Sequence, residues 1–458
     1  MKTKIFYILL LAFFIRLVSI NQSFWLDEAT TATVVRDKNV MQILEFAKGD
    51  FHPPLYYLIS KLWVQIIGLG EFRLRLLSVL FGVGTIYFVY KIGESLKNKT
   101  VGIISALLLA LSGLHIYYSQ EARMYSMAAF FVTAAVHYYL SASKKNKNMY
   151  FFSVAIALSI LSDYLTIFVV PIFLLDAFYK RKKKINLKQF GFIIVPVFVA
   201  LLLILPIFAE QLSSGLGVKG SNPLWWGALG TFNIKNIVLV PIKFMIGRVN
   251  FPKLIYVIVV ALFGAMYSFL LINSQPLLKK NKIIFYWLII PVLLGIIVSM
   301  FLPVLTYFRF LYVLPALYLI LGSGVEGLKE KYFVPVFFVV IILNVFVATR
   351  YLFNDSYHRE DWRGFVKFLS ENKTADAKVV FVNNSQMEAV SYYYPEGDYG
   401  ILEDKDFDRS ELWLMRYVAD IFDPEDKVRS KIEDSGFAER SEHNFRGVVV
   451  YKYEKEIN

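Results

Sequence analysis

Long apolar runs separated by short basic clusters organise the first 350 residues of the chain. The apolar residues gather in continuous blocks and do not form the stripes of an amphipathic surface helix, so they predict helices that span a membrane. The composition agrees, because 57% of the 458 residues are hydrophobic and the mean hydropathy is +0.52. We expect about eleven spans, near residues 5–21, 76–92, 101–118, 126–142, 149–161, 164–179, 190–209, 254–272, 283–301, 308–324 and 332–349.

One further apolar stretch, residues 55–68, predicts a helix that lies along the membrane surface. It contains Lys61 and Gln65 and follows two prolines, and it is shorter than the roughly 20 apolar residues that a span requires. Residues 37–48 and 235–250 have a similar semi-polar character and predict further interfacial helices. If residues 55–68 were a span, the sidedness of everything after them would be reversed.

Lysine clusters between the predicted spans indicate which helix ends face the cytoplasm. Cytoplasmic loops carry an excess of Lys and Arg, and an amino terminus in the cytoplasm places every cluster on that side. The clusters are Lys97 with Lys99, Lys144 with Lys145 and Lys147, residues 180–184, Lys279 with Lys280 and Lys282, and Lys329 with Lys331. The same parity predicts that the polar motifs and the carboxy-terminal tail lie outside the plasma membrane.

A change of composition after residue 350 predicts two domains. Residues 1–350 carry 34 Lys and Arg against 13 Asp and Glu, whereas residues 351–458 carry 15 against 23. For the acidic tail we expect a small, soluble, extracytoplasmic α/β domain. Its strands are predicted at 379–382 and 448–451, and its helices at 361–370 and 424–435, the latter capped by Asp423 with Pro424 at its first position.

The tail shows no glycine-rich phosphate loop and no histidine cluster with metal-ligand spacing. We therefore expect it to shape a substrate site or to dock, and not to hold a second active site. The basic residues of the body fall between the spans, so no nucleic-acid partner is expected. The chain has no cysteine, which excludes disulfides and thiolate chemistry.

Three polar motifs on the predicted outer face carry the candidate chemistry. They are Trp25-Leu26-Asp27-Glu28, His52-Pro53-Pro54-Leu55-Tyr56-Tyr57 and Gln120-Glu121-Ala122-Arg123. A carboxylate at the membrane surface can remove the proton of an acceptor hydroxyl. Arginine and histidine can hold a phosphate through charge-assisted hydrogen bonds. The motifs therefore suggest acid/base chemistry on a lipid-borne substrate.

The same motifs have structural interpretations that the residues alone leave open. The acidic pair of the first motif would cap a helix running from Ala29. The histidine of the second would hydrogen-bond within a turn, and the third would form an ion pair at a helix end. Arg73 and Arg75 would anchor lipid headgroups.

Together the motifs resemble the GT-C glycosyltransferases, and more narrowly the branch that contains the protein O-mannosyltransferases and the lipid A aminoarabinose transferases. The resemblance covers about residues 1–350 and also includes the stretch from Arg73 to Ser78 and Arg309-Phe310-Leu311 with Pro315. It implies a polytopic helical membrane fold. It also implies transfer, on the extracytoplasmic face, of a hexose or pentose from a polyprenyl-phosphate donor to a lipid, glycan or protein acceptor.

The resemblance further implies roles for individual residues. Asp27 is implied as the general base, with Glu28 as the second catalytic carboxylate. The residues implied in binding the donor phosphate and substrate are His52, Arg73, Arg75, Glu121, Arg123, Asp163, Tyr307 and Arg309. The sequence departs from the family in two places: Ala29-Thr30-Thr31 stands where the aminoarabinose transferases carry a basic residue, and Met124-Tyr125 stands where many relatives have an aspartate.

The chemistry of such a donor agrees with these residue types. A leaving phosphate departs with negative charge, so it needs cations and not a proton. No cofactor is therefore required and no metal ligands are predicted, although a divalent metal is compatible with the motifs. Attack opposite the phosphate would invert the anomeric carbon.

The main alternative is a transporter or flippase of polyprenyl-linked sugars. Such a protein should carry ionisable residues at mid-membrane, with paired broken helices. Here the centres of the predicted spans are nearly free of charge and the polar motifs gather on one side, which favours an enzyme. A non-catalytic scaffold that displays the acidic tail is a third interpretation, in which the acidic pair would be incidental.

Overall fold

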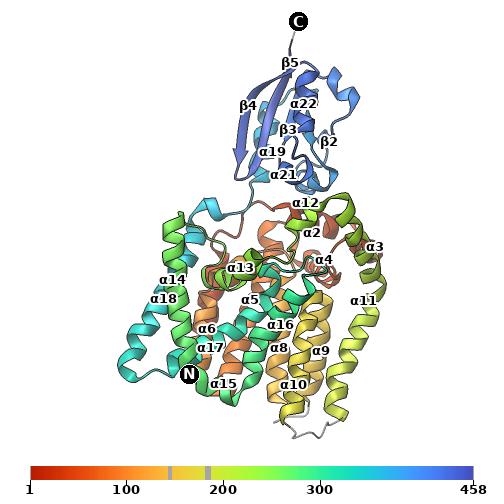
Figure 1. Ribbon diagram of the computed structural model, residues 1–458. Coiled ribbons are helices and arrows are strands. Elements are labelled where there is room, and N and C mark those ends of the chain that lie inside the picture. The colour runs from red at the N-terminus through yellow and green to blue at the C-terminus, as the bar shows by residue number, and fades with distance from the viewer. Residues whose placement is uncertain (1, 143–146, 181–186, 457–458) are drawn as a thin grey trace.

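The computed structural model describes residues 2–142, 147–180 and 187–456, so parts of two predicted lysine clusters, at 143–146 and 181–186, lie outside the described residues. A body of helices carries a smaller domain with a β-sheet at one end (Figure 1). Both the helical fold and the small carboxy-terminal domain are thereby confirmed.

Each of the eleven predicted spans contains a helix. In chain order these are α1 (Lys2–Leu17), α5 (Glu71–Leu96), α6 (Lys99–Ala110) with α7 (Gly113–Ser119), α8 (Tyr125–Ser141), α9 (Asn148–Ser162), η1 (Tyr164–Val169) with α10 (Val170–Lys180), α11 (Leu187–Ser221), α14 (Lys253–Asn273), α16 (Lys282–Val298), η2 (Tyr307–Val313) with α17 (Leu314–Glu326), and α18 (Glu330–Phe353). Within the described ranges, five helices are long and apolar enough to cross a membrane, or six if α6 and α7 form one bent span. The count of eleven therefore stays a prediction.

The predicted span at 101–118 is not one straight helix. α6 and α7 meet at an angle of 65°. α6 ends at Ala110 with Leu111 as its C-cap, and Ser112 caps α7, its hydroxyl accepting a hydrogen bond from the His115 amide at 3.4 Å. Gly113 follows at a close approach to α18, where a Cβ would lie 2.9 Å from Val347 Cγ1. This break places the segment 120–124 at the end of the body that faces the carboxy-terminal domain.

Shorter helices lie between the long ones. They are α2 (Leu26–Asp37), α3 (Val40–Gly49), α4 (Leu55–Ile67), α12 (Pro223–Ala228), α13 (Ile234–Ile246) and α15 (Gln275–Lys280). The predicted helix at residues 55–68 is confirmed as α4, which joins α2 through a hydrogen bond from Lys61 Nζ to the Val35 carbonyl at 2.7 Å. Figure 1 shows α2, α3 and α4 at the end of the body nearest the sheet domain.

The carboxy-terminal domain, described to residue 456, contains a five-stranded sheet in the order β2-β1-β3-β5-β4. β1 (Lys378–Phe381) pairs in parallel with β2 (Tyr399–Ile401) and β3 (Glu411–Met415), whereas β5 (Val448–Lys455) runs antiparallel to β3 and β4 (Phe437–Phe445). The two predicted strands are therefore β1 and β5. The helical elements are η3 (Asp355–Tyr357), α19 (Trp362–Asn372), η4 (Asn384–Gln386), α20 (Glu388–Tyr393), η5 (Asp404–Asp408), α21 (Ala419–Phe422) and α22 (Lys427–Asp434).

The predicted helices of this domain form, with one correction. α19 is capped by Asp361, whose carboxylate accepts a hydrogen bond from the Gly364 amide at 3.0 Å. α22 begins at Lys427 and not at Pro424, because Asp426 takes a positive φ of 56° and interrupts the helical backbone. Asp423 still binds this helix start, accepting hydrogen bonds from the amides of Lys427 at 2.8 Å and Val428 at 3.0 Å.

The two domains share a hydrophobic core at their junction. Phe24 and Ala29, around the start of α2, belong to the same buried cluster as Trp362 and Phe365 of α19. The Phe24 amide also donates a hydrogen bond to the Tyr393 hydroxyl at 2.7 Å. The carboxy-terminal domain is therefore packed directly onto the loop that contains the first polar motif.

The sidedness of the chain can be tested with single cysteines, because the natural sequence has none. Glu371 is exposed on α19 and Lys280 is exposed on α15, and Figure 1 shows these helices at opposite ends of the molecule. A membrane-impermeant thiol reagent is expected to label Glu371→Cys in intact cells and Lys280→Cys only after permeabilisation. The reverse pattern would show that the carboxy-terminal domain is cytoplasmic.

Candidate active site

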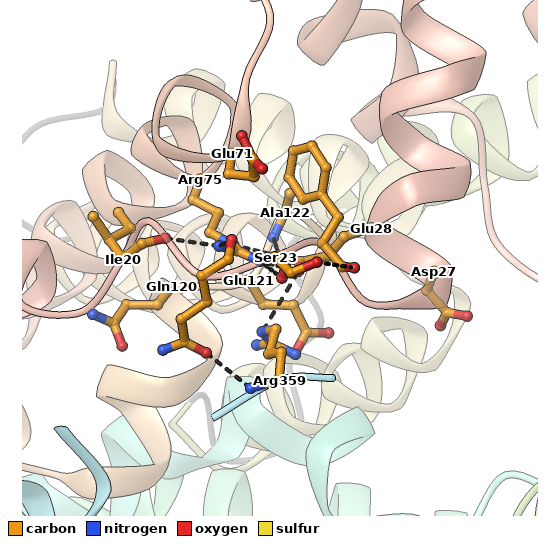
Figure 2. Close-up of polar contacts among 12 residues, drawn as sticks. Ile20, Ser23, Asp27, Glu28, Glu71, Arg75, Gln120, Glu121, Ala122 and Arg359 are labelled. Atoms are coloured by element: carbon orange, nitrogen blue, oxygen red, sulfur yellow. Dashed lines mark hydrogen bonds and ion pairs between the residues drawn. The ribbon is translucent and has the colours of Figure 1, made fainter. Parts of the chain in front are cut away.

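The acidic pair lies in the first turn of α2, which begins at Leu26 with Trp25 at the N-cap and no side-chain cap. The interpretation of the pair as the cap of a helix starting at Ala29 is therefore wrong. The two carboxylates have different environments: the Asp27 side chain is 40% exposed, whereas that of Glu28 is fully buried. Figure 2 shows Glu28 inside a polar cluster and Asp27 directed away from it.

Among the ion pairs of the described residues, Asp27 is paired with Arg123. The Arg123 Nη2 atom lies 3.8 Å from Asp27 Oδ2 and 3.1 Å from His52 Nδ1, while Nη1 donates a hydrogen bond to the Tyr57 hydroxyl at 3.1 Å. The Arg123 side chain is only 4% exposed. Three motifs far apart in the sequence therefore meet around one guanidinium, as expected if they form one site.

Asp50 completes this group and was not predicted from the sequence. Its carboxylate accepts a hydrogen bond from the Tyr57 hydroxyl at 2.7 Å and lies 3.6 Å from His52 Nδ1. Burial acts to raise the pKa of Asp50, but His52, Arg123 and Tyr57 outweigh it and hold that pKa below its ordinary value. Asp50 therefore supplies a fixed negative charge behind His52.

A cavity of about 280 Å³ begins at His52 and extends between apolar helices. Its polar end contains Asp163 and Arg309 besides His52, and its other walls are mostly apolar. These walls come from η1, α11, α12, α16 and the segment 302–304, and they include Leu165, Phe168, Phe208, Leu212, Leu216, Trp226, Leu229, Val298 and Leu302. The cavity thus combines three ionisable side chains, those of His52, Asp163 and Arg309, with a mostly apolar lining.

Asp163 is held at this polar end by its local backbone. Its carboxylate caps η1 by accepting a hydrogen bond from the Leu165 amide at 2.8 Å. Burial raises the pKa of Asp163, and the nearby His52 and Arg309 only partly oppose this shift. Arg309 donates a hydrogen bond to the Pro303 carbonyl at 2.6 Å, which fixes its side chain at the cavity wall.

Glu28 and Arg75 form a buried ion pair next to the group of Asp27, His52 and Arg123, which we call the open site. Arg75 donates to both Glu28 oxygens, at 2.8 Å from Nε and 2.5 Å from Nη2, and also to the carbonyls of Ile20, Gln22 and Ser23. Burial would raise the pKa of Glu28, yet Arg75 and Arg359 reverse the effect and lower it. The Ala122 amide donates a further hydrogen bond to Glu28 Oε1 at 2.7 Å. Neither Glu28 nor Arg75 lines the cavity.

Arg359 is a second member of this buried cluster that sequence reasoning missed. It follows α18, and its Nη2 donates a hydrogen bond to Glu121 Oε2 at 2.8 Å, while its Nε lies 3.5 Å from Glu28 Oε2. Burial raises the pKa of Glu121, with Arg359 opposing and Glu28 reinforcing the shift. We call Glu28, Arg75, Glu121 and Arg359 the carboxylate cluster (Figure 2).

Two predicted site residues, Arg73 and Tyr307, lie outside the group around Arg123, the cavity and the carboxylate cluster. Arg73 is exposed on α5, where its Nη1 donates a weak hydrogen bond to the Leu69 carbonyl at 3.4 Å. Tyr307 packs against Phe308, with ring centroids 5.5 Å apart, and does not line the cavity. Asp50, two residues before His52, could have been found from the sequence as a neighbour of the second motif. Arg359 had no such signal.

No group of three or more His, Asp or Glu in the described ranges is arranged to hold a metal ion.

The family comparison agrees with this geometry. A family model described as dolichyl-phosphate-mannose-protein mannosyltransferase matches residues 51–209, which include His52, Glu121, Arg123 and Asp163. No curated protein sequence matches the chain.

Solved structures match over nearly the whole chain. ArnT from Cupriavidus metallidurans, bound to undecaprenyl phosphate, is 12% identical with a TM-score of 0.58, over 98% of this chain and 97% of that one. The oligosaccharyltransferase AglB from Archaeoglobus fulgidus, in complex with an inhibitory peptide and a dolichol-phosphate, is 13% identical with a TM-score of 0.56, over 98% of this chain and 74% of that one.

This chain has a GT-C fold, and its residues 51–209 match the mannosyltransferase family model. The matching family model describes a mannosyltransferase, and AglB is an oligosaccharyltransferase. The described residues contain five or six helices that are long and apolar enough to cross a membrane. The resemblance predicted from the motifs is thereby confirmed at the level of the fold.

Thermal unfolding of purified protein in detergent can separate the roles of the adjacent carboxylates. Glu28→Gln is expected to lower the free energy of unfolding by roughly 3–5 kcal/mol, because it leaves Arg75 and Arg359 buried with one fewer anionic partner. Asp27→Asn is the matched control, and its half-exposed side chain predicts a change within about 0.5 kcal/mol. Equal losses in the two variants would contradict this division.

Proposed function

We propose that this protein transfers a sugar from a polyprenyl-phosphate donor to an acceptor hydroxyl on the extracytoplasmic face of the membrane. Asp27 acts as the general base, and His52, Arg123 and Arg309 hold the donor phosphate. One observation carries the proposal: the half-exposed Asp27 carboxylate lies beside Arg123, and Arg123 contacts His52, which lines a mostly apolar cavity that also contains Arg309.

The cavity suits a ligand with an ionic head and a hydrocarbon tail. Apolar side chains line most of it, and burying a hydrocarbon chain among them is favourable by roughly 0.8 kcal/mol per methylene group. His52 and Arg309 at its polar end can bind a phosphate through charge-assisted hydrogen bonds. The undecaprenyl phosphate bound to ArnT and the dolichol-phosphate bound to AglB support a ligand of this class.

The reaction follows from the positions of the charged groups. The acceptor oxygen attacks the anomeric carbon as Asp27 removes its proton, and the bond from that carbon to the phosphate oxygen breaks. The departing polyprenyl phosphate keeps the electron pair, and the cations of the site stabilise its negative charge. A single displacement of this kind inverts the anomeric carbon.

Asp27 is a better candidate base than Glu28 because of its accessibility. Its side chain is 40% exposed, whereas Glu28 is enclosed by Arg75, Arg359 and the Ala122 amide. Glu28 then acts as a positioning residue for the neighbouring aspartate. The proposal leaves the sugar open, and the acceptor can be a lipid, a glycan or a protein. The proposal requires no metal, because arginines can stabilise a phosphate leaving group, and it is also compatible with a divalent metal.

The base assignment is tested with purified protein, a panel of undecaprenyl-phosphate hexoses and pentoses, and cell-envelope extract as the acceptor source. Asp27→Asn is expected to lower the transfer rate by at least about 100-fold, as general acid–base catalysis contributes 10²–10⁴-fold. Asp37→Asn, at the far end of the same helix, is the control, because Asp37 pairs with its neighbour Arg36 at 2.7 Å. Full activity of Asp27→Asn would disprove the assignment.

The phosphate site is tested through its arginines. Arg123→Ala and Arg309→Ala should each weaken donor binding or turnover by roughly 10- to 150-fold, because a hydrogen bond to a charged group contributes about 1.5–3 kcal/mol. Arg309→Lys should restore only part of the loss, since lysine lacks the bidentate fork. Arg440→Ala, which removes an exposed arginine paired with Glu454, should leave the donor KM unchanged. Wild-type donor kinetics in both alanine variants would place the phosphate elsewhere, with Arg248 and Lys243 as the next candidates.

A further inference from the structure

We propose that Arg359, which belongs to the segment leading into the carboxy-terminal domain, is a positioning residue that sets the separation between Asp27 and Arg123. The proposal rests on the proposed function for its kinetic consequences. Its geometric part concerns only how two backbone segments of the body are held together.

Arg359 binds the two segments that carry the reactive groups. Glu28 directly follows Asp27 in α2, and Glu121 lies two residues before Arg123. One guanidinium contacts both glutamates, at 3.5 Å from Glu28 Oε2 and 2.8 Å from Glu121 Oε2. A shift of this guanidinium would therefore move both segments relative to each other.

The balance of buried charge makes this contact necessary. Glu28 and Glu121 are 0% and 2% exposed as side chains and lie close enough to repel each other. Arg75 contacts Glu28 and not Glu121 among the described ion pairs, so Arg359 is the cation bound directly to Glu121. Removing one member of a buried charged group leaves an uncompensated charge, which is strongly unfavourable. Without Arg359 the two glutamates are expected to move apart.

Arg359 is itself held rigidly from both domains. Its backbone amide donates a hydrogen bond to Gln22 Oε1 at 2.9 Å, and its guanidinium stacks over the Tyr117 ring at 4.4 Å. Only two residues separate it from Trp362 at the start of α19, which is fully buried in the core shared with Phe24. The docking of the carboxy-terminal domain thus fixes the position of the guanidinium.

The chain offers a matched control for this contact. Arg363 lies four residues further along and crosses the same domain junction, with its Nη1 3.2 Å from Glu71 Oε1 and its Nη2 bonded to the Asn21 carbonyl at 3.1 Å. It touches neither Glu28 nor Glu121 in any described contact. Arg363→Met therefore removes one ion pair and one hydrogen bond at the junction, but it leaves the shared apolar core and the contacts of Arg359 with Glu28 and Glu121 unchanged.

The kinetic experiment compares Arg359→Met, Arg359→Lys and Arg363→Met in the full-length protein. Arg359→Met is expected to lower kcat by about 10- to 100-fold with a donor KM within about threefold of the parent, because a misplacement of 1 Å can cost 100-fold in rate while His52 and Arg309 hold the donor phosphate without any described contact to Arg359. Arg359→Lys should recover part of kcat, since it keeps the charge. Arg363→Met should keep the parent kcat. An equal loss of kcat in Arg363→Met, or an unchanged kcat in Arg359→Met, would overturn the proposal.

Hydrogen–deuterium exchange tests the bridge without any assay of transfer. The Ala122 amide donates to Glu28 Oε1 at 2.7 Å, so peptides covering residues 120–124 report whether the two segments remain joined. Exchange in these peptides should be faster in Arg359→Met than in the parent and unchanged in Arg363→Met. Unchanged exchange in Arg359→Met would refute the bridge even if the kinetics were altered. If the parent protein transfers no sugar, the proposed function fails while this measurement still decides the role of Arg359.

Discussion

The burial of two glutamates at the domain junction is the constraint on which the rest of the site depends. Glu28 and Glu121 lie out of contact with water, and a buried carboxylate is tolerated only when cations and hydrogen-bond donors surround it. Arg75, Arg359 and the Ala122 amide meet this requirement. They come from α5, from the start of the carboxy-terminal domain and from the segment between α7 and α8. Satisfying these charges therefore ties three distant parts of the chain together.

The open site is built on the outer side of this cluster. Successive residues of an α-helix project about 100° apart, so the start of α2 can bury Glu28 while leaving Asp27 half exposed. The turn that contributes Glu121 to the cluster likewise presents Arg123 to Asp27, His52 and Tyr57. The first and third motifs thus each contribute one residue to the carboxylate cluster and another to the group around Arg123, and the second motif contributes His52 and Tyr57 to that group. The separation of these roles explains why two adjacent acidic residues are expected to respond differently to substitution.

The carboxy-terminal domain is joined to the site by charge as well as by packing. Its aromatic residues share a core with Phe24, and the Tyr393 hydroxyl accepts a hydrogen bond from the Phe24 amide and donates one to Glu71. Arg359 extends this junction into the carboxylate cluster. A domain without a recognisable catalytic motif can in this way influence chemistry that takes place in the helical body.

The sequence by itself determined the helical segments, the small α/β tail and the membership of the three motifs in one site. Apolar blocks and cap residues act locally, so α4, α19, β1 and β5 could be predicted from neighbouring residues alone. The start of α22 could not be predicted in this way, because it depends on the positive φ of Asp426. The bend between α6 and α7 could not be predicted either, because it lies inside one continuous apolar block, where Ser112 caps the second helix. Only the tertiary structure showed that Glu28 and Arg75 are buried together and that Arg73 lies outside both groups. It also showed that Asp50 belongs to the group around Arg123 and that Arg359 belongs to the carboxylate cluster. Burial and ion pairing depend on which distant segments meet, and Arg359 is more than 230 residues from Glu121, beyond the reach of any local pattern.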